Sequence, residues 1–593
     1  MLCTMNKFIL GFISVLLSSL YVNSAQIDNQ IIQAMRDELK RSMNELHLKG
    51  LEKPYYIEYI LNISSEYSIS SQLGAVCYKS VEGNKVALLT TNVRVGDYKF
   101  DNTGFNDISY MFFGSTTDDD NEVYIDRRIP AEFDYNMLRR ELWLATDAAY
   151  KVAAEELTKK KVTLDGKIIR DTTWNFSKAN PVVTIDTNSF EAFDAEKYTK
   201  LTKDISKLFA SHSDIISSNV EINYIPKIIY YVNSEGIEYI KNEGYVTFNI
   251  VGYTQREDGI PIVNAHSCTA NKLSELPTTD SLTVITNRII SNIEANMKAS
   301  ILEDSYVGPV LFEEPAAAEL LISYFANNLS AVPKNVLSSG WSTSDNSGLA
   351  FQNKIGSRVL PTFISIEDKP SQSKYKNINL LGHYKIDDDG IAARDVELVK
   401  DGYLKTLLST RIPVKKINES NGHKRYNQTI YSNLFVNSNK SQQLTNKELK
   451  KQLLKLCKDR ELPYGIIVKN IISSNLLENS IRSLIPRIDF VRNDKGNLLS
   501  FDIYKIYQDG HEELVVGGDL SGFNAASFKD IIKTGKDIYI YNTLLFKYAT
   551  LFSGSLTLPV SIITPSLLLE EGELKVSEAD YPKLHYIKSP LAD

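Results

Sequence analysis

Residues 27–63, IDNQIIQAMRDELKRSMNELHLKGLEKPYYIEYILNI, decide the fold, because the spacing of their apolar residues changes midway. Ile31, Met35 and Leu39 recur at four-residue steps among charged residues, which is typical of an amphipathic helix packed against a core. Residues 54–63 are instead rich in Tyr and Ile, and this composition indicates a strand. A long helix that leads directly into a strand predicts a chain that mixes both elements.

The same two patterns recur along the rest of the sequence. Further helices are expected at residues 135–159, 192–211, 282–302, 316–329 and 446–461. Strands are expected at residues 67–73, 85–98, 219–251, 310–312, 359–366, 382–386, 395–400, 403–408, 487–491 and 498–507. The predicted fold class is α+β, with two mixed regions of long helices packed on largely antiparallel sheets.

The length and charge of the chain limit its organisation and its partners. A chain of 593 residues is too long for one hydrophobic core. The composition shifts near residue 300, so we expect an N-terminal α+β region at residues 26–300 and a β-rich C-terminal region at residues 301–593. With 66 Lys and Arg, 73 Asp and Glu, and a net charge of −7, the chain has no basic block. This balance excludes nucleic acid as the main partner.

Residues 1–25 have the pattern of a secretory signal peptide. Lys7 supplies the positive charge, and the apolar stretch at residues 8–20 is shorter than the ~20 residues that span a bilayer. The alternative is an N-terminal membrane anchor. No later stretch is long and apolar enough for a transmembrane span, so we expect an exported protein, either periplasmic or extracellular.

Common catalytic and metal-binding motifs are absent from the sequence. There is no GxSxG, P-loop or Rossmann glycine pattern, and Val515 stands where an HExxH motif beginning at His511 needs its second His. Residues 118–120 are three Asp residues without the spacing of a calcium loop, so a solvated loop is favoured. His266 and Cys268 could share one face of a strand, and we expect a buried pair rather than a metal site.

Three cysteines remain after removal of the signal peptide. Cys457 lies on the helical pattern at residues 446–461 and is predicted to be a small buried apolar residue. Two of Cys77, Cys268 and Cys457 could form a disulfide in an oxidising compartment, and the sequence does not select the pair.

Several short motifs occur in a fixed order along the chain. In the first half they are residues 34–39 (AMRDEL), 94–98 (RVGDY) and 231–236 (YVNSEG). In the second half they are residues 358–361 (RVLP), 388–390 (DDG), 402–405 (GYLK), Arg411 and 422–425 (GHKR). In their order and rough spacing, from about residue 30 to residue 590, these motifs resemble those of the TldD/PmbA family of metallopeptidases and their partner subunits. The resemblance implies the two-part α+β architecture of that family.

Active members of this family carry HExxxH on a helix of the second half, and a later Cys completes a zinc site. Two imidazoles and a thiolate leave the fourth position of zinc for water, and the Glu serves as a base. By the resemblance, residues 316–329 (AAAELLISYFANNL) correspond to this helix and place Ile322, Ser323 and Asn327 at the motif positions. Leu551 falls at the position of the Cys. Because these side chains cannot replace the zinc ligands and the base, we expect vestigial positions with no catalytic residue, no metal and no cofactor.

The resemblance therefore favours a non-catalytic subunit, similar to the partner-subunit type of the family. Such a subunit would pair with a TldD-like paralogue as a heterodimer and help to bind extended peptides. Sheet edges suit peptide β-addition, and the 33 Tyr residues suit the lining of an amphipathic groove.

Two alternatives leave open whether the chain is itself an enzyme. One is a peptidase with a relocated site that uses His383, Asp388 and His423, with Asp388, Arg411 and His423 as candidate binding residues. Against this, His383 is expected on the strand at residues 382–386, and His423 lies in a glycine-flanked loop that could equally form a basic patch. The other alternative is a non-enzymatic envelope protein that binds a polymer or partner proteins.

Overall fold

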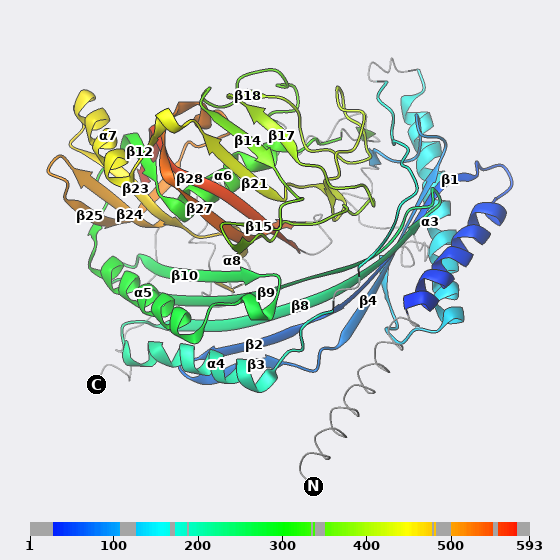
Figure 1. Ribbon diagram of the computed structural model, residues 1–593, viewed down its shortest axis with the longest axis horizontal. Coiled ribbons are helices and arrows are strands. Elements are labelled where there is room, and N and C mark those ends of the chain that lie inside the picture. The colour runs from blue at the N-terminus through cyan, green and yellow to red at the C-terminus, as the bar shows by residue number, and fades with distance from the viewer. Residues whose placement is uncertain are drawn as a thin grey trace, which may run out of the picture.

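The computed structural model describes residues 28–106, 126–166, 172–186, 189–333, 336–337, 350–476, 480–481, 500–548 and 555–577. Two large sheets organise these residues. Figure 1 shows the C-terminal part of the chain lying above the long curved strands of the N-terminal sheet. Helices pack against both sheets, so the predicted α+β class is confirmed.

The N-terminal sheet contains nine strands among the described residues. They are β1 (Pro54–Ser65), β2 (Tyr67–Gln72), β3 (Ala75–Ser80), β4 (Lys85–Val95), β6 (Asp126–Ile129), β7 (Val183–Ile185), β8 (Ser217–Asn233), β9 (Glu238–Gln255) and β10 (Pro261–Ala270). The order along the sheet is β10-β9-β8-β1-β4-β6, the β2–β3 hairpin joins β8, and β7 joins β9. Every pairing is antiparallel except that of β7 with β9, which agrees with the predicted class of largely antiparallel sheets.

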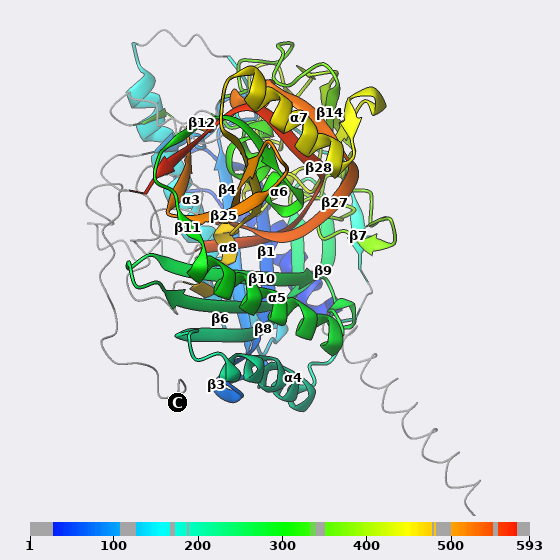
Figure 2. The same ribbon diagram turned by 90° about the vertical axis from the view of Figure 1, so that its left-hand side faces the viewer.

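Helices cover this sheet at two places. Residues 28–45 form the expected helix, which packs with α3 (Tyr135–Leu164) against β1 and β4. The helices α4 (Ala195–Lys207) and α5 (Thr279–Lys298) cover the face that is turned away from the C-terminal part, as Figures 1 and 2 show. Their buried residues pack with Phe248 and Ile250 of β9 in one hydrophobic cluster.

The C-terminal sheet contains thirteen strands among the described residues and mixes parallel with antiparallel pairs. They are β11 (Ser300–Ile301), β12 (Tyr306–Phe312), β14 (Ile364–Asp368), β17 (Val396–Lys400), β18 (Tyr403–Leu404), β21 (Asn433–Ser438), β22 (Gln443–Leu444), β23 (Tyr464–Ile471), β24 (Ser500–Tyr507), β25 (Glu512–Val516), β26 (Gly518–Ser521), β27 (Ile531–Tyr548) and β28 (Ser555–Val576). The main order is β11-β25-β24-β23-β12-β28-β21-β14-β17-β18. The two large sheets thus divide the chain between β10 and β11.

Smaller elements complete the fold. The strands β5 (Phe105–Asn106) and β13 (Val336–Leu337) pair with each other and connect the two halves. Short hairpins are formed by β15 (Lys374–Tyr375) with β16 (Ile378–Asn379) and by β19 (Lys424–Arg425) with β20 (Gln428–Thr429). The C-terminal helices are α6 (Glu314–Tyr324), α7 (Asn446–Asp459) and the short α8 (Ser474–Leu476).

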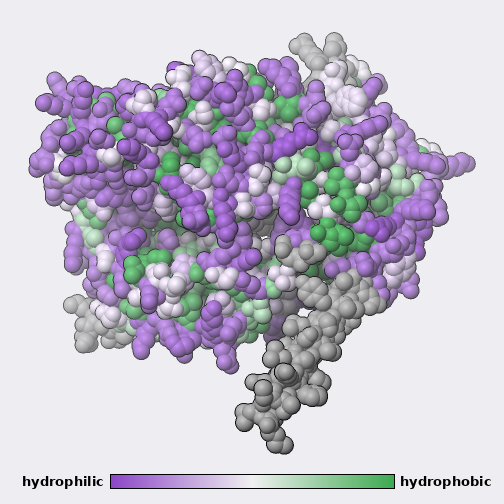
Figure 3. Space-filling view, in the orientation of Figure 1, coloured by the Kyte–Doolittle hydropathy of each residue, from purple (hydrophilic) through white to green (hydrophobic). Residues whose placement is uncertain are grey.

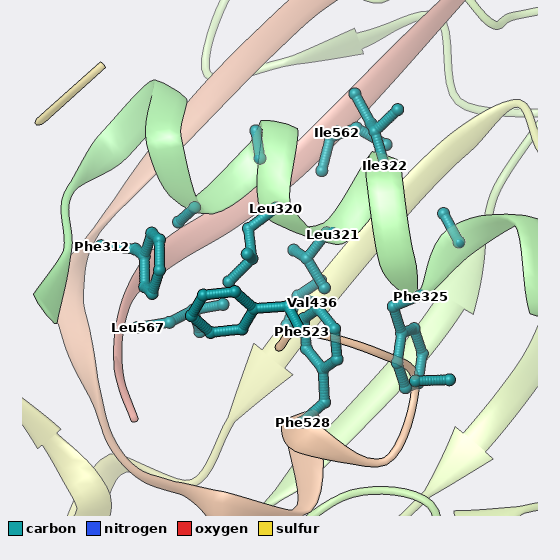
Figure 4. Close-up of a cluster of buried hydrophobic side chains, with 14 of the residues drawn as sticks. Phe312, Leu320, Leu321, Ile322, Phe325, Val436, Phe523, Phe528, Ile562 and Leu567 are labelled. Carbon is teal, nitrogen blue, oxygen red and sulfur yellow. The ribbon is translucent and has the colours of Figure 1, made fainter. Parts of the chain in front are cut away.

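The largest hydrophobic core surrounds α6. Leu320 and Leu321 are at most 1% exposed and belong to one cluster with Phe523 and Phe528. Figure 4 shows these side chains gathered beneath the helix. Burial of so much apolar surface is the main favourable term in folding, so α6 is a central element of the C-terminal half.

Four expected elements differ from the structure. The strand expected at residues 359–366 begins only at Ile364. The strand at residues 382–386 is wrong: Gly382 lies against the backbone of Ser432, where a Cβ would be 2.2 Å from the carbonyl oxygen, and only Ile386 forms an isolated bridge. The strand at residues 403–408 stops after β18, because the chain leaves the sheet and Leu408 N donates to Leu329 O at 2.8 Å. The helix at residues 316–329 ends at Tyr324 and continues as a 3₁₀ turn.

Several expectations fall on residues outside the described part of the chain. They are the signal peptide at residues 1–25, the acidic residues 118–120, Leu551 and the strand at residues 487–491. Among the helices that are described, none is long and apolar enough to cross a membrane. The face in Figure 3 is mostly hydrophilic, with hydrophobic side chains in separate small groups, as is usual for a protein surface.

Replacing Leu320 by Ala tests the central position of α6. The change leaves a cavity in a core that packs without exposure to solvent, so we expect the free energy of unfolding to fall by about 2–5 kcal/mol. Val284→Ala on α5, where the side chain is 59% exposed, is the matched control and should cost less than about 0.5 kcal/mol. Urea unfolding followed by circular dichroism measures both, and equal midpoints for the two variants would contradict the assignment.

Candidate functional site

The helix α6 owes its position to its sequence. Pro315 occupies the first turn, where a missing N–H breaks no helical hydrogen bond, and three alanines follow. Residues 316–322 are all buried, and the helix packs against β23, β27 and β28. A helix without a polar face belongs to a core. The element that carries the expected vestigial positions is therefore enclosed by the C-terminal half.

The positions expected for zinc ligands do not fit a metal. Ile322 is 7% exposed, belongs to the same cluster as Ile562 and lies next to it in Figure 4. Ser323 and Asn327 are half-buried, and the side-chain amide of Asn327 donates to Ile322 O at 3.4 Å. Isoleucine has no ligand atom, and zinc sites in proteins are built from Cys, His and carboxylate side chains. No group of three or more such side chains within the described ranges is arranged to hold a metal ion.

A buried carboxyl group lies on α6 one turn before Ile322. Glu319 is 2% exposed, and its Oε1 accepts a hydrogen bond of 2.6 Å from the hydroxyl of Tyr541 on β27. Burial raises the pKa of Glu319 to about 7, although the bond from Tyr541 acts in the opposite direction. The sequence signal was available, because an acidic residue three positions before Ile322 shares its helix face. Glu319 is nevertheless absent from the residues predicted from the sequence.

Arg411 lies between the two halves of the protein. It is fully buried and donates two hydrogen bonds, of 3.0 and 2.6 Å, to the carbonyl oxygen of Ser177. Its guanidinium also forms an ion pair of 2.5 Å with Glu235, in the turn between β8 and β9. The ring of Phe176 lies 4.0 Å from the Arg411 guanidinium and 3.8 Å from that of Arg94 on β4. Arg411 thus joins the two halves, and its positive charge is paired with groups of the N-terminal half.

Asp388 takes part in the same boundary. Its Oδ1 lies 2.7 Å from Nζ of Lys241 on β9, and Lys241 also pairs with Glu243 at 2.7 Å. Burial alone would raise the pKa of Asp388, but Lys241 and the hydrogen bonds it makes hold this pKa below its usual range. The neighbouring Asp389 pairs with Lys424 at 2.7 Å. The predicted binding carboxylate is therefore engaged by cations of the protein itself.

The centre of this boundary is Glu58 on β1. It is 3% exposed and accepts hydrogen bonds from Tyr56, Tyr231 and Asn92 at 2.6, 2.8 and 2.6 Å. Burial would raise the pKa of Glu58, but Lys424 and these three bonds outweigh it and hold the pKa at about 2. We call this set of charged residues the ionic layer: Glu58, Glu235, Lys241, Glu243, Asp388, Asp389, Arg411 and Lys424.

The second predicted histidine is placed differently from the expectation. His423 is fully buried, not on an accessible basic patch, and its Nε2 lies 2.8 Å from Oδ2 of Asp368. Its Nδ1 lies 2.9 Å from Oδ1 of Asn421. His383 is exposed, in a loop rather than a strand, with Nδ1 2.8 Å from Pro370 O. His383, Asp388 and His423 thus each have a different partner within the protein.

The cysteines have a simple outcome. Cys77 is exposed, Cys268 is half-buried and Cys457 is buried, and all three are free thiols. The prediction for Cys457 is confirmed, because it packs with Leu449 and Leu453 in a cluster beneath α7. The pair expected at His266 and Cys268 is wrong in part, since His266 is exposed on β10.

Comparison with known protein families identifies a domain in the C-terminal half. Residues 305–483 match the family model described as the PmbA/TldA metallopeptidase C-terminal domain. The second half thus has a domain of a metallopeptidase class, and it includes α6 and the loops of the ionic layer. Residues 305–483 are thus similar to a domain of the TldD/PmbA family. No curated protein sequence matches it.

Solved structures share the fold along most of the chain. TldE from Thermococcus kodakarensis is 13% identical with a TM-score of 0.53, covering 91% of this chain and 100% of that one. A protein of Thermotoga maritima provisionally described as a modulator of a DNA gyrase is 14% identical with a TM-score of 0.53, covering 88% and 96%. A similarly described protein of Bacteroides thetaiotaomicron is 12% identical with a TM-score of 0.55, covering 92% and 98%. At these identities the similarity concerns the fold.

Lys424→Met tests the ionic layer. The change leaves the carboxylates of Asp389 and Glu58 buried without their nearest cation, so we expect a loss of about 3–5 kcal/mol of unfolding free energy at pH 7. A carboxyl whose folded pKa is lowered stabilises the fold above its unfolded pKa, and this contribution disappears as the pH falls through the folded value. The gap between wild type and variant should therefore narrow from about pH 5 downward, since the pKa of Glu58 is about 2 when folded.

The control for this prediction is Lys200→Met. Lys200 pairs with Asp204 on the exposed face of α4, so its removal should change the unfolding free energy by less than about 0.5 kcal/mol at any pH. Urea midpoints at pH 7, 5 and 3.5 provide the comparison. A gap for Lys424→Met that stays constant over this range would show that its cost is not ionic.

Glu319→Gln tests the buried carboxyl group. Its effect on stability changes with pH in the direction opposite to that of Glu58. The folded pKa of about 7 exceeds the unfolded value, so wild type loses stability as the pH rises from about 4.5 to 7. Gln keeps an acceptor for Tyr541 and removes the titration. We expect the variant to gain roughly 2–3 kcal/mol over wild type across this range, as measured by urea unfolding. Glu82→Gln, at an exposed turn, should show no such trend, and parallel curves for wild type and Glu319→Gln would refute the assignment.

Proposed function

We propose that this chain is an exported TldD/PmbA-type subunit that has no zinc site of its own and acts with a paired, zinc-bearing paralogue. In this role it contributes a surface that binds extended peptides, while the paralogue supplies the hydrolytic chemistry. Export rests on the signal-peptide pattern of residues 1–25.

The observation that carries the proposal is the environment of α6. At the first ligand position, Ile322 is packed into the hydrophobic core beside α6 and offers no ligand atom to a metal ion. Ser323 has no carboxylate to act as a base, and Asn327 is bonded to the helix backbone. The helix supports the fold by apolar burial, and this is the expected outcome when zinc chemistry is performed by another chain.

The alternative of a relocated active site is not favoured. Its central residue, His423, is fully buried between Asp368 and Asn421, so a peptide cannot reach its ring. A general base must come within hydrogen-bond distance of the proton that it removes. Asp388 is likewise occupied by Lys241. The other alternative is a non-enzymatic envelope protein. As in the proposal, the chain itself would have no catalytic activity. Unlike the proposed subunit, it would have no TldD-like partner.

Zinc content and co-purification test the proposal together. We expect the purified mature chain to hold less than about one tenth of an equivalent of zinc, because three buried or half-buried positions lack ligands. An HExxxH-bearing paralogue from the same source, prepared in parallel, should hold about one equivalent and should co-purify with the chain as a 1:1 complex.

The other outcomes are equally informative. Stoichiometric zinc in this chain, with peptide hydrolysis that is abolished by a chelator, would overturn the proposal. Peptide hydrolysis that survives chelators but is lost in His423→Ala would favour the relocated site. A lone monomer that binds neither paralogue nor peptide would favour the envelope protein.

A further inference from the structure

A groove lies at the open end of the C-terminal sheet. It has a volume of about 570 Å³ and is lined by residues 394–397 along one side. Residues 417–421 form the other side, with Thr406 and Ser409 between them. A volume of this size lies within the range of about 300–1,000 Å³ that is usual for binding sites.

One side of the groove is an edge of the sheet. The strand β17 is paired with β14 on its inner side, but on its outer side β18 pairs only with Val399 and Lys400. The last bond on this side joins Lys405 N to Leu398 O at 2.8 Å. The pairing of β17 with β14 is irregular at Leu398, because Ile366 pairs with Val399 and Glu367 pairs with Glu397. Val396 and Glu397 therefore form the edge of the sheet beyond β18. Within the described part of the chain, no strand continues the sheet beyond this point.

The opposite side of the groove is held in place. Ser409 Oγ donates to Glu419 O at 2.9 Å, and Ser409 N donates to Oδ1 of Asn421 at 2.8 Å. The amide of Asn421 also donates to Leu407 O at 3.0 Å, and its Oδ1 lies 2.9 Å from the buried ring of His423. The wall is thus fixed by side chains that reach back into the core. A preformed groove costs little ordering entropy on binding.

The charge of the lining favours basic ligands. Asp395, Glu397 and Glu419 are acidic, and Arg394 is the one basic residue among the lining residues. The carboxylate of Asp395 is oriented by bonds of 3.2 and 2.7 Å from the backbone and hydroxyl of Ser371. Lys400 offsets part of the charge of Glu397, at 3.2 Å. The remaining acidic excess attracts Lys or Arg side chains and repels acidic ones.

We propose that this groove binds an extended peptide segment with basic side chains, which adds as a strand to the outer edge of β17. The inference rests on the proposed function, in which the chain helps to bind peptides, and it names the site and the charge of the peptide. In this geometry the edge of β17 at Val396 and Glu397 supplies the main-chain hydrogen bonds, and alternate side chains of the peptide face the acidic residues. The groove is separate from α6, so peptide binding there needs no metal.

The test uses the full mature chain and labelled peptides of defined sequence. The probe is acetyl-KVKTKVKT-amide carrying fluorescein, and binding is followed by fluorescence anisotropy at fixed ionic strength. Two matched peptides are acetyl-EVETEVET-amide and the basic peptide with N-methyl groups on alternate backbone nitrogens. We expect both to bind at least about tenfold more weakly, because one loses charge complementarity and the other loses main-chain hydrogen bonds.

Two charge-reversal variants locate the site. Glu419→Lys, in the groove wall, should weaken binding of the basic peptide about tenfold, whereas Glu82→Lys, at the exposed turn between β3 and β4, should leave it unchanged. Both residues are exposed, and equal urea midpoints show that each variant folds. Similar losses for the two variants would overturn the site, because binding would then reflect net charge. Indifference to N-methylation, or no binding at all, would overturn strand addition.

The outcomes separate this inference from the proposed function. Zinc content and pairing with a paralogue are measured without these peptides. A zinc-free chain that pairs with its paralogue but does not bind the basic peptide refutes the groove alone. A chain with stoichiometric zinc that still binds the peptide at this edge refutes the proposed function and leaves the groove intact.

Discussion

The buried charge of Arg411 is the constraint on which the joint between the two halves depends. A guanidinium without exposure to water is costly unless acceptors, carboxylates or aromatic faces around it compensate its charge. Here Ser177, Glu235 and Phe176 supply these groups, and all three come from the N-terminal half. Separating the halves would expose or unpair the charge. The relative position of the two sheets is therefore set by electrostatic pairing as much as by apolar contact.

The rest of the ionic layer follows the same logic. Carboxylates and amines alternate from Glu58 through Lys424 to Asp389, and again from Glu243 through Lys241 to Asp388. Lys424 and Lys241 each lie between two carboxylates, so no buried charge among these residues lacks a partner of opposite charge. Such a layer adds specificity of position more readily than net stability, because desolvation consumes much of the Coulomb energy.

The sequence predicts local structure well where the apolar pattern is strong. It predicts the role of a residue poorly where the partner of that residue lies far away in the sequence. The helix at residues 28–45 and the strand β1 follow from apolar spacing alone. Asp388, Arg411 and His423 stand out as charged residues in motifs, and the structure does assign each a specific partner. Those partners, such as Lys241 for Asp388, lie on elements that no local pattern connects with them. The loop at residues 382–386 differs from the predicted strand for a similar reason, since the close approach of Gly382 to Ser432 is a tertiary contact.

The inner face of α6 carries side chains that suit a hydrophobic core. A buried zinc site balances a divalent cation with a thiolate and neutral imidazoles, and removing one ligand leaves polar groups or charge in an apolar core. The face with Glu319 and Ile322 instead has an isoleucine in the core and a carboxyl group that burial keeps largely protonated up to about pH 7. A neutral carboxyl with one phenol partner is compatible with the core around it, whereas an isolated imidazole or carboxylate is not. The same face therefore supports the fold by burial, and under the proposed function a peptide would bind at a different surface, such as the open edge of β17.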